Sequence, residues 1–368
     1  MKNRSIGRKA AWPAVTILAF LFTSPLPGAE KWQNINTQNT AGLAGNEIQF
    51  IEPTGGEIWI GTLSGLSYYR GGKFGTVVME KTRRVRQDGK QVEVTEEVPA
   101  KFQAWDVLDL GGGSYLVGSQ AGVYPLKDGK VGDVSLEQFT VSPIFRYQTD
   151  EVWALCKDRG TERNTLYRRA QGEWAPIKEF ADKRIADVAR TADGHVWVVI
   201  DGDGVLEIDP KTGVAKAEHH LQGLNVTSVF RTGKGHVWCG TWGRGVFSRT
   251  NGKWISHLGK LKSAVLDIDE GNDGAVWVAT TADGLWRYDG NQWAGQLAGE
   301  GPINLLYVDG KGRVWVSSQL GGGLRYTSGD EWVVSLPGPL PMRCLVEDPQ
   351  GRLWAGGVLD GLHVRGGL

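Results

Sequence analysis

The sequence predicts an all-β fold: a single β-propeller of about eight four-stranded blades. Glycine supplies 53 of the 368 residues, about twice its usual ~7% share, and there are 16 tryptophans against 3 methionines. This composition is typical of turn-rich β-structure and not of a helical bundle. With 40% hydrophobic residues the chain has enough apolar side chains to form a large core. The third observation is a short pattern that returns at a nearly fixed spacing.

The repeated pattern consists of a turn with glycine, one variable residue, an aliphatic residue and tryptophan, followed by a glycine–aliphatic pair. A clear copy runs from Asp193 to Trp197, with Gly204-Val205 after it. The aromatic residue of the pattern recurs at Trp59, Tyr115, Trp153, Trp197, Trp238, Trp277, Trp315 and Trp354. Their mean spacing is about 42 residues, and a period of ~40–45 residues is the signature of propeller blades. The copies at Tyr115 and Trp153 are degenerate, and seven blades are the alternative count.

Each unit is expected to contribute four strands. A short apolar-rich strand, such as residues 265–268, comes before the turn, and the turn needs glycine because it requires positive φ. The strand with the first tryptophan follows, and the second glycine begins a third strand. A fourth strand carries another tryptophan, as at Trp293. Twelve of the 16 tryptophans occupy these two repeated positions, and we expect them to pack in the core.

The two ends of the chain have separate predictions. Residues 1–29 have the layout of a secretory signal peptide, with a basic segment (2–9), an apolar stretch (14–22) and small residues ending at Ala29. The apolar stretch is shorter than the ~20 residues that span a bilayer, and an uncleaved anchor is the alternative. We therefore expect a secreted or periplasmic propeller of residues 30–368.

The ring is expected to close through its ends. The eighth unit ends at Leu368, before its fourth strand, and Lys31-Trp32 carries the mark of the missing strand. We therefore expect residues 31–36 to pair with residues 361–365. This closure would leave no open edge in the ring.

An insert of residues 77–98 interrupts the period and reads as a hairpin about Asp88-Gly89. Pairing outward from this turn places basic residues opposite acidic ones, so the charges satisfy one another. The expected pairs are Val85 with Val92, Arg84 with Glu93, and Lys81 with Glu96. We expect a solvated hairpin, and not an arm that binds nucleic acid or a membrane.

Motifs for chemistry are missing. The chain has 41 basic and 41 acidic residues, which argues against a nucleic-acid-binding surface over the whole protein. The three cysteines, Cys156, Cys239 and Cys344, have no zinc-site spacing. The segment 201–204 lacks the further acidic ligands of a calcium loop, and the pair His219-His220 is a weak metal candidate. We predict no metal, no cofactor and no catalytic residue.

Propellers bind ligands at one end of the central channel, where loops of all blades converge. In this repeat, the loops after the tryptophan strand and the beginnings of the first strands should line that end. Trp242 lies outside the periodic set and Arg244 follows two residues later, a pair that suits a sugar, a peptide or an anionic ligand. A tryptophan that covers a neighbouring blade is the alternative. The candidate ligand-binding residues are Trp242, Arg244, Asn225, Asn304, Arg343, Arg184, Trp105, Gln319 and Asn46.

Three stretches resemble the two-component regulator propeller repeat: residues 58–62, 238–241 and 345–356. In that family the repeats form periplasmic sensor domains, usually two propellers ahead of a membrane helix and a kinase, whereas these 368 residues show one ring and neither segment. The resemblance implies the propeller fold and a sensor-like role. From all these observations we expect a monomeric, exported propeller that binds a small molecule, glycan or protein and has no catalysis of its own. The alternatives are a lyase or hydrolase acting at the channel mouth, or a scaffold of an envelope complex.

Overall fold

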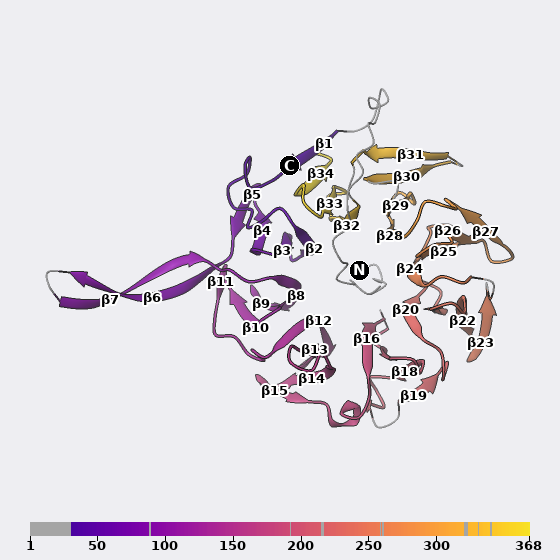
Figure 1. The fold of residues 1–368 in the computed structure, drawn as a ribbon, viewed down its shortest axis with the longest axis horizontal. Coiled ribbons are helices and arrows are strands. Elements are labelled where there is room, and N and C mark those ends of the chain that lie inside the picture. The colour runs from indigo at the N-terminus through magenta and orange to yellow at the C-terminus, as the bar shows by residue number, and fades with distance from the viewer. Residues whose placement is uncertain are drawn as a thin grey trace.

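The computed structural model describes residues 31–368 except 88–89, 192, 215–216, 258, 260, 320–322, 330 and 339–340. The predicted signal peptide lies outside the described residues. In the described part of the chain, no helix combines the length and apolarity needed to span a bilayer. The described residues form eight sheets arranged in a ring (Figure 1), and all strand pairs in them are antiparallel except β11 with β6. The predicted all-β propeller with eight blades is therefore confirmed.

Within blades 1 to 7, the four strands of the repeat run outward from the centre of the ring in chain order. Blade 1 contains β2 (Ile48–Thr54), β3 (Glu57–Thr62), β4 (Gly65–Arg70) and β5 (Lys73–Thr76). Blade 2 contains β8 (Ala104–Gly111), β9 (Ser114–Ser119), β10 (Gly122–Lys127) and β11 (Lys130–Val131). Blade 3 contains β12 (Phe139–Gln148), β13 (Glu151–Asp158), β14 (Asn164–Ala170) and β15 (Glu173–Pro176), and the short 3-10 helix η1 (Lys178–Phe180) follows it.

The remaining blades repeat this order. Blade 4 contains β16 (Ile185–Arg190), β17 (Val196–Ile200), β18 (Val205–Ile208) and β19 (Glu218–His220). Blade 5 contains β20 (Val226–Arg231), β21 (Val237–Thr241), β22 (Val246–Thr250) and β23 (Lys253–His257). Blade 6 contains β24 (Val265–Glu270), β25 (Val276–Thr280), β26 (Leu285–Tyr288) and β27 (Trp293–Gln296). Blade 7 contains β28 (Ile303–Val308), β29 (Val314–Ser318), β30 (Leu324–Ser328) and β31 (Glu331–Leu336).

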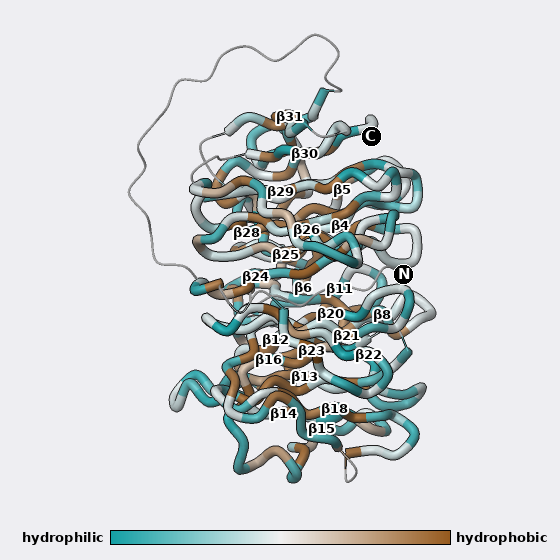
Figure 2. Tube along the Cα trace, turned by 90° about the vertical axis from the view of Figure 1, so that its right-hand side faces the viewer, coloured by the Kyte–Doolittle hydropathy of each residue, from teal (hydrophilic) through white to brown (hydrophobic). Residues whose placement is uncertain are grey.

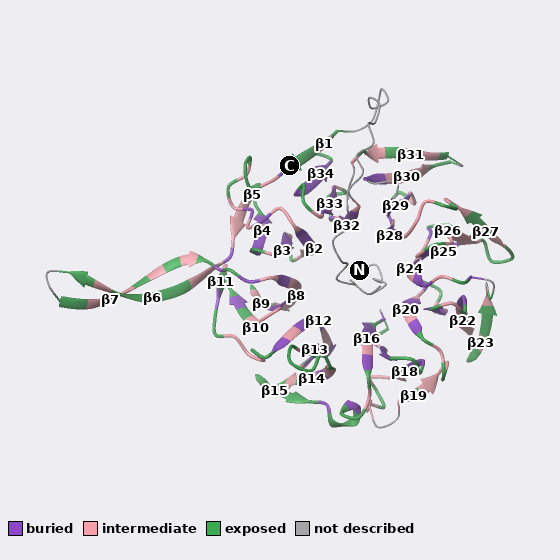
Figure 3. Cartoon of the chain, in the orientation of Figure 1, coloured by how far each residue is buried: buried purple, intermediate pink, exposed green. Residues whose placement is uncertain are grey.

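The core lies between neighbouring blades. The seven tryptophans of the first repeated position are buried, at 0–5% exposure, as predicted. Hydrophobic residues follow the strands and hydrophilic ones gather at the turns (Figure 2). Burial falls from the inner strands to the outer strands (Figure 3). The second set of tryptophans, on the outer strands, is only half-buried and covers the core from the side.

Buried carboxylates hold the tryptophans in blades 7 and 8. The indole N–H of Trp315 donates to Asp309 Oδ2 at 2.8 Å, and Trp354 donates to Asp348 in the same way. Arg313 and Arg352 add a second hydrogen bond to each carboxylate, at 2.6 Å. Each buried negative charge is thus paired and hydrogen-bonded, the condition under which burial is tolerated.

The second glycine of the repeat is required by close packing. Gly284 has φ +78°, and a Cβ there would lie 2.6 Å from the carbonyl oxygen of Gln296 in the outer strand of the same blade. Gly204 and Gly361 share the positive φ and the close carbonyl. Any other residue at these positions would separate the third strand from the fourth.

The ring closes as predicted. Blade 8 contains β32 (Met342–Glu347), β33 (Leu353–Gly357), β34 (Leu362–Arg365) and, as its outermost strand, β1 (Trp32–Ile35). β1 pairs antiparallel with β34, from Trp32 opposite Arg365 to Ile35 opposite Leu362. Ile35 is 1% exposed, and the Trp32 ring meets the Trp315 ring edge-on at 6.1 Å, which ties blade 8 to blade 7.

A long hairpin, β6 (Val78–Gln87) and β7 (Lys90–Pro99), extends from blade 2 away from the ring (Figure 1). The predicted register is confirmed, including Val85 opposite Val92 and Arg84 opposite Glu93. Only the base joins the core: β6 pairs with β11 at Val78 and Met79. Most residues beyond the base are exposed or half-buried.

The closure predicts that the single change Ile35→Ala destabilises the whole ring. Truncating a fully buried isoleucine costs ~2–5 kcal/mol, so the melting temperature should fall by several degrees. The matched control is Gln33→Ala, an exposed position in the same strand. Equal melting temperatures of the two variants by circular dichroism would contradict the closure.

The hairpin predicts the opposite response. Replacing residues 81–96 with a short Gly-Ser linker should leave the melting temperature unchanged, because these residues lie beyond the pairing with β11. Near-ultraviolet circular dichroism should also be unchanged. Loss of cooperative melting would show that the arm covers part of the core.

Candidate ligand-binding site

The predicted site residues belong to one face of the ring. In each blade, the first strand begins and the second strand ends on this face, because the two strands are antiparallel. We call it the mouth face. The opposite face, where first strands end and the Asp-x-x-Gly turns lie, is called the turn face.

A repeated backbone hydrogen bond brings the two predicted sets of residues together. The residue after the second strand donates its N–H to the carbonyl of the residue before the first strand. Trp242 donates to Asn225 at 2.9 Å, Asp201 donates to Arg184 at 2.7 Å, and Gln319 donates to Pro302 at 3.0 Å. Candidate residues that are about 17 residues apart in sequence therefore lie side by side within one blade.

The predicted beginnings of the first strands divide into two positions. Trp105, Asn304 and Arg343 each occupy a β-bulge, the strand residue that the pairing with the second strand skips. Arg184 and Asn225 lie just before their strands. A bulge frees the skipped residue from the ladder and redirects its side chain. The sequence did not reveal the bulges, because nothing in the residue pattern marks them.

The bulge residues of neighbouring blades contact one another or the next blade. Arg343 Nη1 of blade 8 donates to Gln49 Oε1, at the bulge of blade 1, at 2.6 Å. Thr227 Oγ1, at the bulge of blade 5, donates to Val265 O of blade 6 at 2.7 Å. Gln49 and Thr227 were not among the predicted site residues. The Trp105 indole N–H is buried without a hydrogen-bond partner among the described residues.

The loop that begins at Trp242 is fixed in its backbone and open in its side chains. Besides its bond to Asn225, Trp242 forms an isolated bridge with Ala264 at the beginning of blade 6. Asp283 reinforces this junction by accepting the Ser263 N–H at 3.1 Å. Trp242 is nevertheless 61% exposed, whereas every other tryptophan among the described residues is buried or half-buried.

The other predicted residues are more engaged. Arg184 is exposed and pairs with Asp201 at 3.1 Å. Asn46 uses its side-chain oxygen to accept the Thr37 N–H at 2.8 Å, so it holds the segment after β1. Asn304 and Gln319 are half-buried. Leu359, which sequence reasoning missed, is 57% exposed in the corresponding loop of blade 8.

A second group of polar residues lies away from the mouth, at the outer part of blades 4 and 5. Glu207, Glu218 and His220 have ligand atoms within 4.8 Å of one another, the geometry of a metal site. However, the Arg249 guanidinium contacts Glu207 and lies 3.5 Å from Glu218, so a positive charge already occupies the cluster. Burial would raise the pKa of Glu207, but hydrogen bonds from His220 and Arg249 lower it on balance.

The two histidines of the predicted metal candidate do not act together. Consecutive residues of a strand point to opposite sides, and His220 joins Glu207 whereas His219 contacts Asp203 O at 2.6 Å. The cluster therefore works as an ion-pair network that joins blade 4 to blade 5.

Comparison with known proteins finds likeness in structure but not in sequence. No protein-family model and no curated protein matches the chain. The extracellular domain of the hybrid two-component system BT4673 from B. thetaiotaomicron is similar at TM-score 0.52 and 16% identity, over 89% of this chain and 44% of that one. This chain thus spans less than half the length of that extracellular domain.

Two other structures are similar at TM-score 0.51. One is a catalytically inactive virginiamycin B lyase from Staphylococcus aureus with quinupristin, at 12% identity over 77% of this chain and 98% of that one. The other is YCF48 bound to D1 peptide, at 13% identity over 73% and 94%. At such identities the likeness shows the fold alone, and the three proteins have different functions on it.

The exposure of Trp242 is directly measurable. Replacing it with phenylalanine should lower acrylamide quenching of the tryptophan fluorescence more than any other single replacement, because it is the most accessible indole described. The matched control is Trp105→Phe, a half-buried position on the same face. Stability should change by no more than ~0.5 kcal/mol, as for other surface changes. Quenching equal to that of the parent would show that Trp242 is covered.

Proposed function

We propose that this chain is an exported, sensor-like propeller that binds a ligand or partner at its mouth face and does no chemistry on it. The Trp242 loop carries the proposal. The seven periodic tryptophans of the first position are buried between blades, whereas Trp242 presents most of its indole to solvent. A large exposed aromatic on a fixed backbone is typical of a binding anchor.

The geometry of the loop favours binding without rearrangement. The Trp242 backbone is held by Asn225 and Ala264, so little conformational freedom would be lost when a ligand arrives. Arg244 is exposed, and no carboxylate lies within 4 Å of it in the described part of the chain. An aromatic face and an unpaired guanidinium together suit a sugar ring, a peptide or an anionic group.

The polar candidates supply the specificity. Asn225 is exposed beside Trp242, and Asn304 and Arg343 occupy the bulges of blades 7 and 8. These are positions where side chains differ from blade to blade on an otherwise repeated backbone. Variable residues at fixed positions are where a repeat scaffold acquires specificity.

The sensor-like type and the export rest on two supports. The similar domain of BT4673 is extracellular and belongs to a two-component system. The first 29 residues have the layout of a signal peptide. Binding in place of catalysis is favoured because the described mouth-face residues include no set of histidine and glutamate side chains held together as a metal site.

The test is a binding screen of the exported protein against panels of oligosaccharides and peptides by thermal shift, followed by calorimetry on each hit. The double change Trp242→Ala with Arg244→Ala should weaken binding about thirtyfold or more, since a buried anchor costs ~2 kcal/mol or more when truncated. The matched control is Ile255→Ala, which removes an exposed apolar side chain from the outer strand β23. A ligand bound equally well by the double variant would place the site elsewhere.

A further inference from the structure

On the turn face, neighbouring blades are joined by the residues that end the first strands. In blades 2, 3, 5, 6 and 8, a residue at or near the end of the first strand contacts the blade before it. The contacts are Asp109 with Thr54, Arg231 with Asp193, Glu270 with the Gly233 N–H, and Glu347 with the Gly310 N–H. In blade 3, Arg146 Nη2 likewise donates to Asp109 O of blade 2 at 3.1 Å. These contacts link successive blades on the turn face.

In the described part of the chain, blade 4 lacks such a contact to blade 3 at this position. Arg190 holds the same position as Arg231, since it pairs with Val196 as Arg231 pairs with Val237. It is exposed, and among the described residues it has neither a carboxylate within 4 Å nor a hydrogen-bond acceptor. Arg190 therefore occupies the position of the inter-blade contacts but has no hydrogen-bond or ion-pair partner among the described residues.

The reason lies in the preceding blade. Between β12 and β13 the connection is only residues 149–150, whereas blade 5 uses residues 232–236 for the same turn. The short connection still contains a carboxylate, Asp150, but no ion pair joins it to Arg190, whereas the longer turn of blade 4 brings Asp193 to Arg231. The shortened turn thus leaves space on the turn face as well as an unpaired charge.

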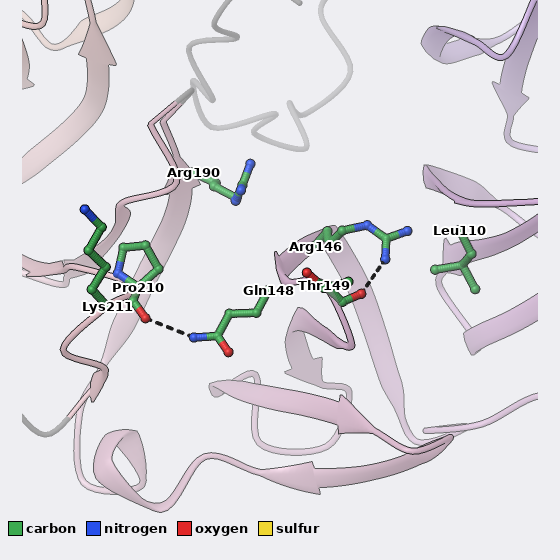
Figure 4. A pocket seen from close by; sticks show the side chains of 7 residues that line it. All are labelled: Leu110, Arg146, Gln148, Thr149, Arg190, Pro210 and Lys211. Atoms are coloured by element: carbon green, nitrogen blue, oxygen red, sulfur yellow. Dashed lines mark hydrogen bonds between the residues drawn. The ribbon is translucent and has the colours of Figure 1, made fainter.

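A hollow of about 680 Å³ lies at this place, between blades 2, 3 and 4 (Figure 4). Its walls are held by hydrogen bonds to backbone carbonyls. Arg146 Nη1 donates to Thr149 O at 2.9 Å, and Gln148 Nε2 donates to Pro210 O of blade 4 at 2.9 Å. The lining residues are Leu110, Arg146, Gln148, Thr149, Arg190, Pro210 and Lys211.

The hollow carries uncompensated positive charge. Arg146, Arg190 and Lys211 line it, and none of the three has a carboxylate within 4 Å in the described part of the chain. The nearby Asp209 is not a lining residue and accepts the backbone N–H of Lys211 at 2.8 Å. Guanidinium groups bind carboxylate and phosphate oxygens through paired N–H donors.

We propose that this hollow is a second binding site, for a small solute that carries two or more carboxylate or phosphate groups. The cations do not converge on one point: Figure 4 shows Arg190 and Arg146 on different sides of the hollow, with Lys211 beyond Pro210. Anionic groups spaced along one molecule can meet them where a single ion cannot. The site lies on the face opposite Trp242, so it stands or falls independently of the mouth-face proposal.

The test is calorimetry of the exported protein with two probes at low ionic strength, citrate for carboxylates and fructose 1,6-bisphosphate for phosphates. Fructose serves as the neutral control. At least one anionic probe should bind, and binding should weaken as salt is added. The probe that binds better identifies the anionic group. Failure of both probes to bind at millimolar concentration overturns the proposal.

Two variants then locate the site. Arg190→Gln should weaken binding about tenfold or more, because it removes a guanidinium of the hollow that has no internal partner among the described residues. Thr149→Glu should do the same by placing an internal carboxylate against Arg146. The matched control is Arg168→Gln, an exposed arginine of blade 3 outside the lining, which should change binding less than twofold. Equal binding by Arg190→Gln and Arg168→Gln would overturn the proposal.

Discussion

The pairing of β1 with β34 is the constraint on which the rest of the structure depends. When one blade combines strands from both ends of the chain, backbone hydrogen bonds join the first and last parts of the propeller and close the ring. Here four residues, Trp32 to Ile35, supply the outer strand of blade 8. They cover the buried residues of β34 and place Trp32 against Trp315 of blade 7. The other blades can then pack tryptophan against their neighbours around a closed ring.

The sequence predicted this ring well because its determinants are local and repeated. Tryptophan positions, the glycine of each turn and the Lys31-Trp32 mark all describe one unit, and eight copies reinforce each other. The hairpin register was predicted for the same reason: a two-residue turn fixes every pair that follows it. Even the degenerate copies at Tyr115 and Trp153 occupy the expected buried strand positions.

The sites were predicted less well, because they arise from departures from the repeat. The bulge that frees Asn304 and Arg343 depends on how two strands pair, and no residue type announces it. The copy of the pattern before Trp153 lacks the turn glycine, but the sequence did not show that the shorter turn at Thr149 leaves a hollow. The hollow forms where side chains from blades 2, 3 and 4 surround this shortened turn. Sequence reasoning considers one unit at a time, whereas these features belong to several.

Together these observations describe a scaffold whose interior is uniform and whose two faces differ. The core repeats one arrangement, in which tryptophan packs between neighbouring sheets. Both proposed binding sites lie where one blade departs from the repeat. On the mouth face the departure is Trp242, and on the turn face it is the short turn before Glu151. Neither departure disturbs the ring, because both lie outside the paired strands.

Hydrogen exchange measured by mass spectrometry tests the central claim, the closed ring, most directly. The comparison is between β1 and β27, which are both four-residue outer strands, in the intact protein under native conditions. A closed ring predicts that the amides of β1 that bond to β34 are protected as well as the corresponding amides of β27. Exchange of β1 at the rate of an unfolded peptide, with β27 protected, would contradict the closure.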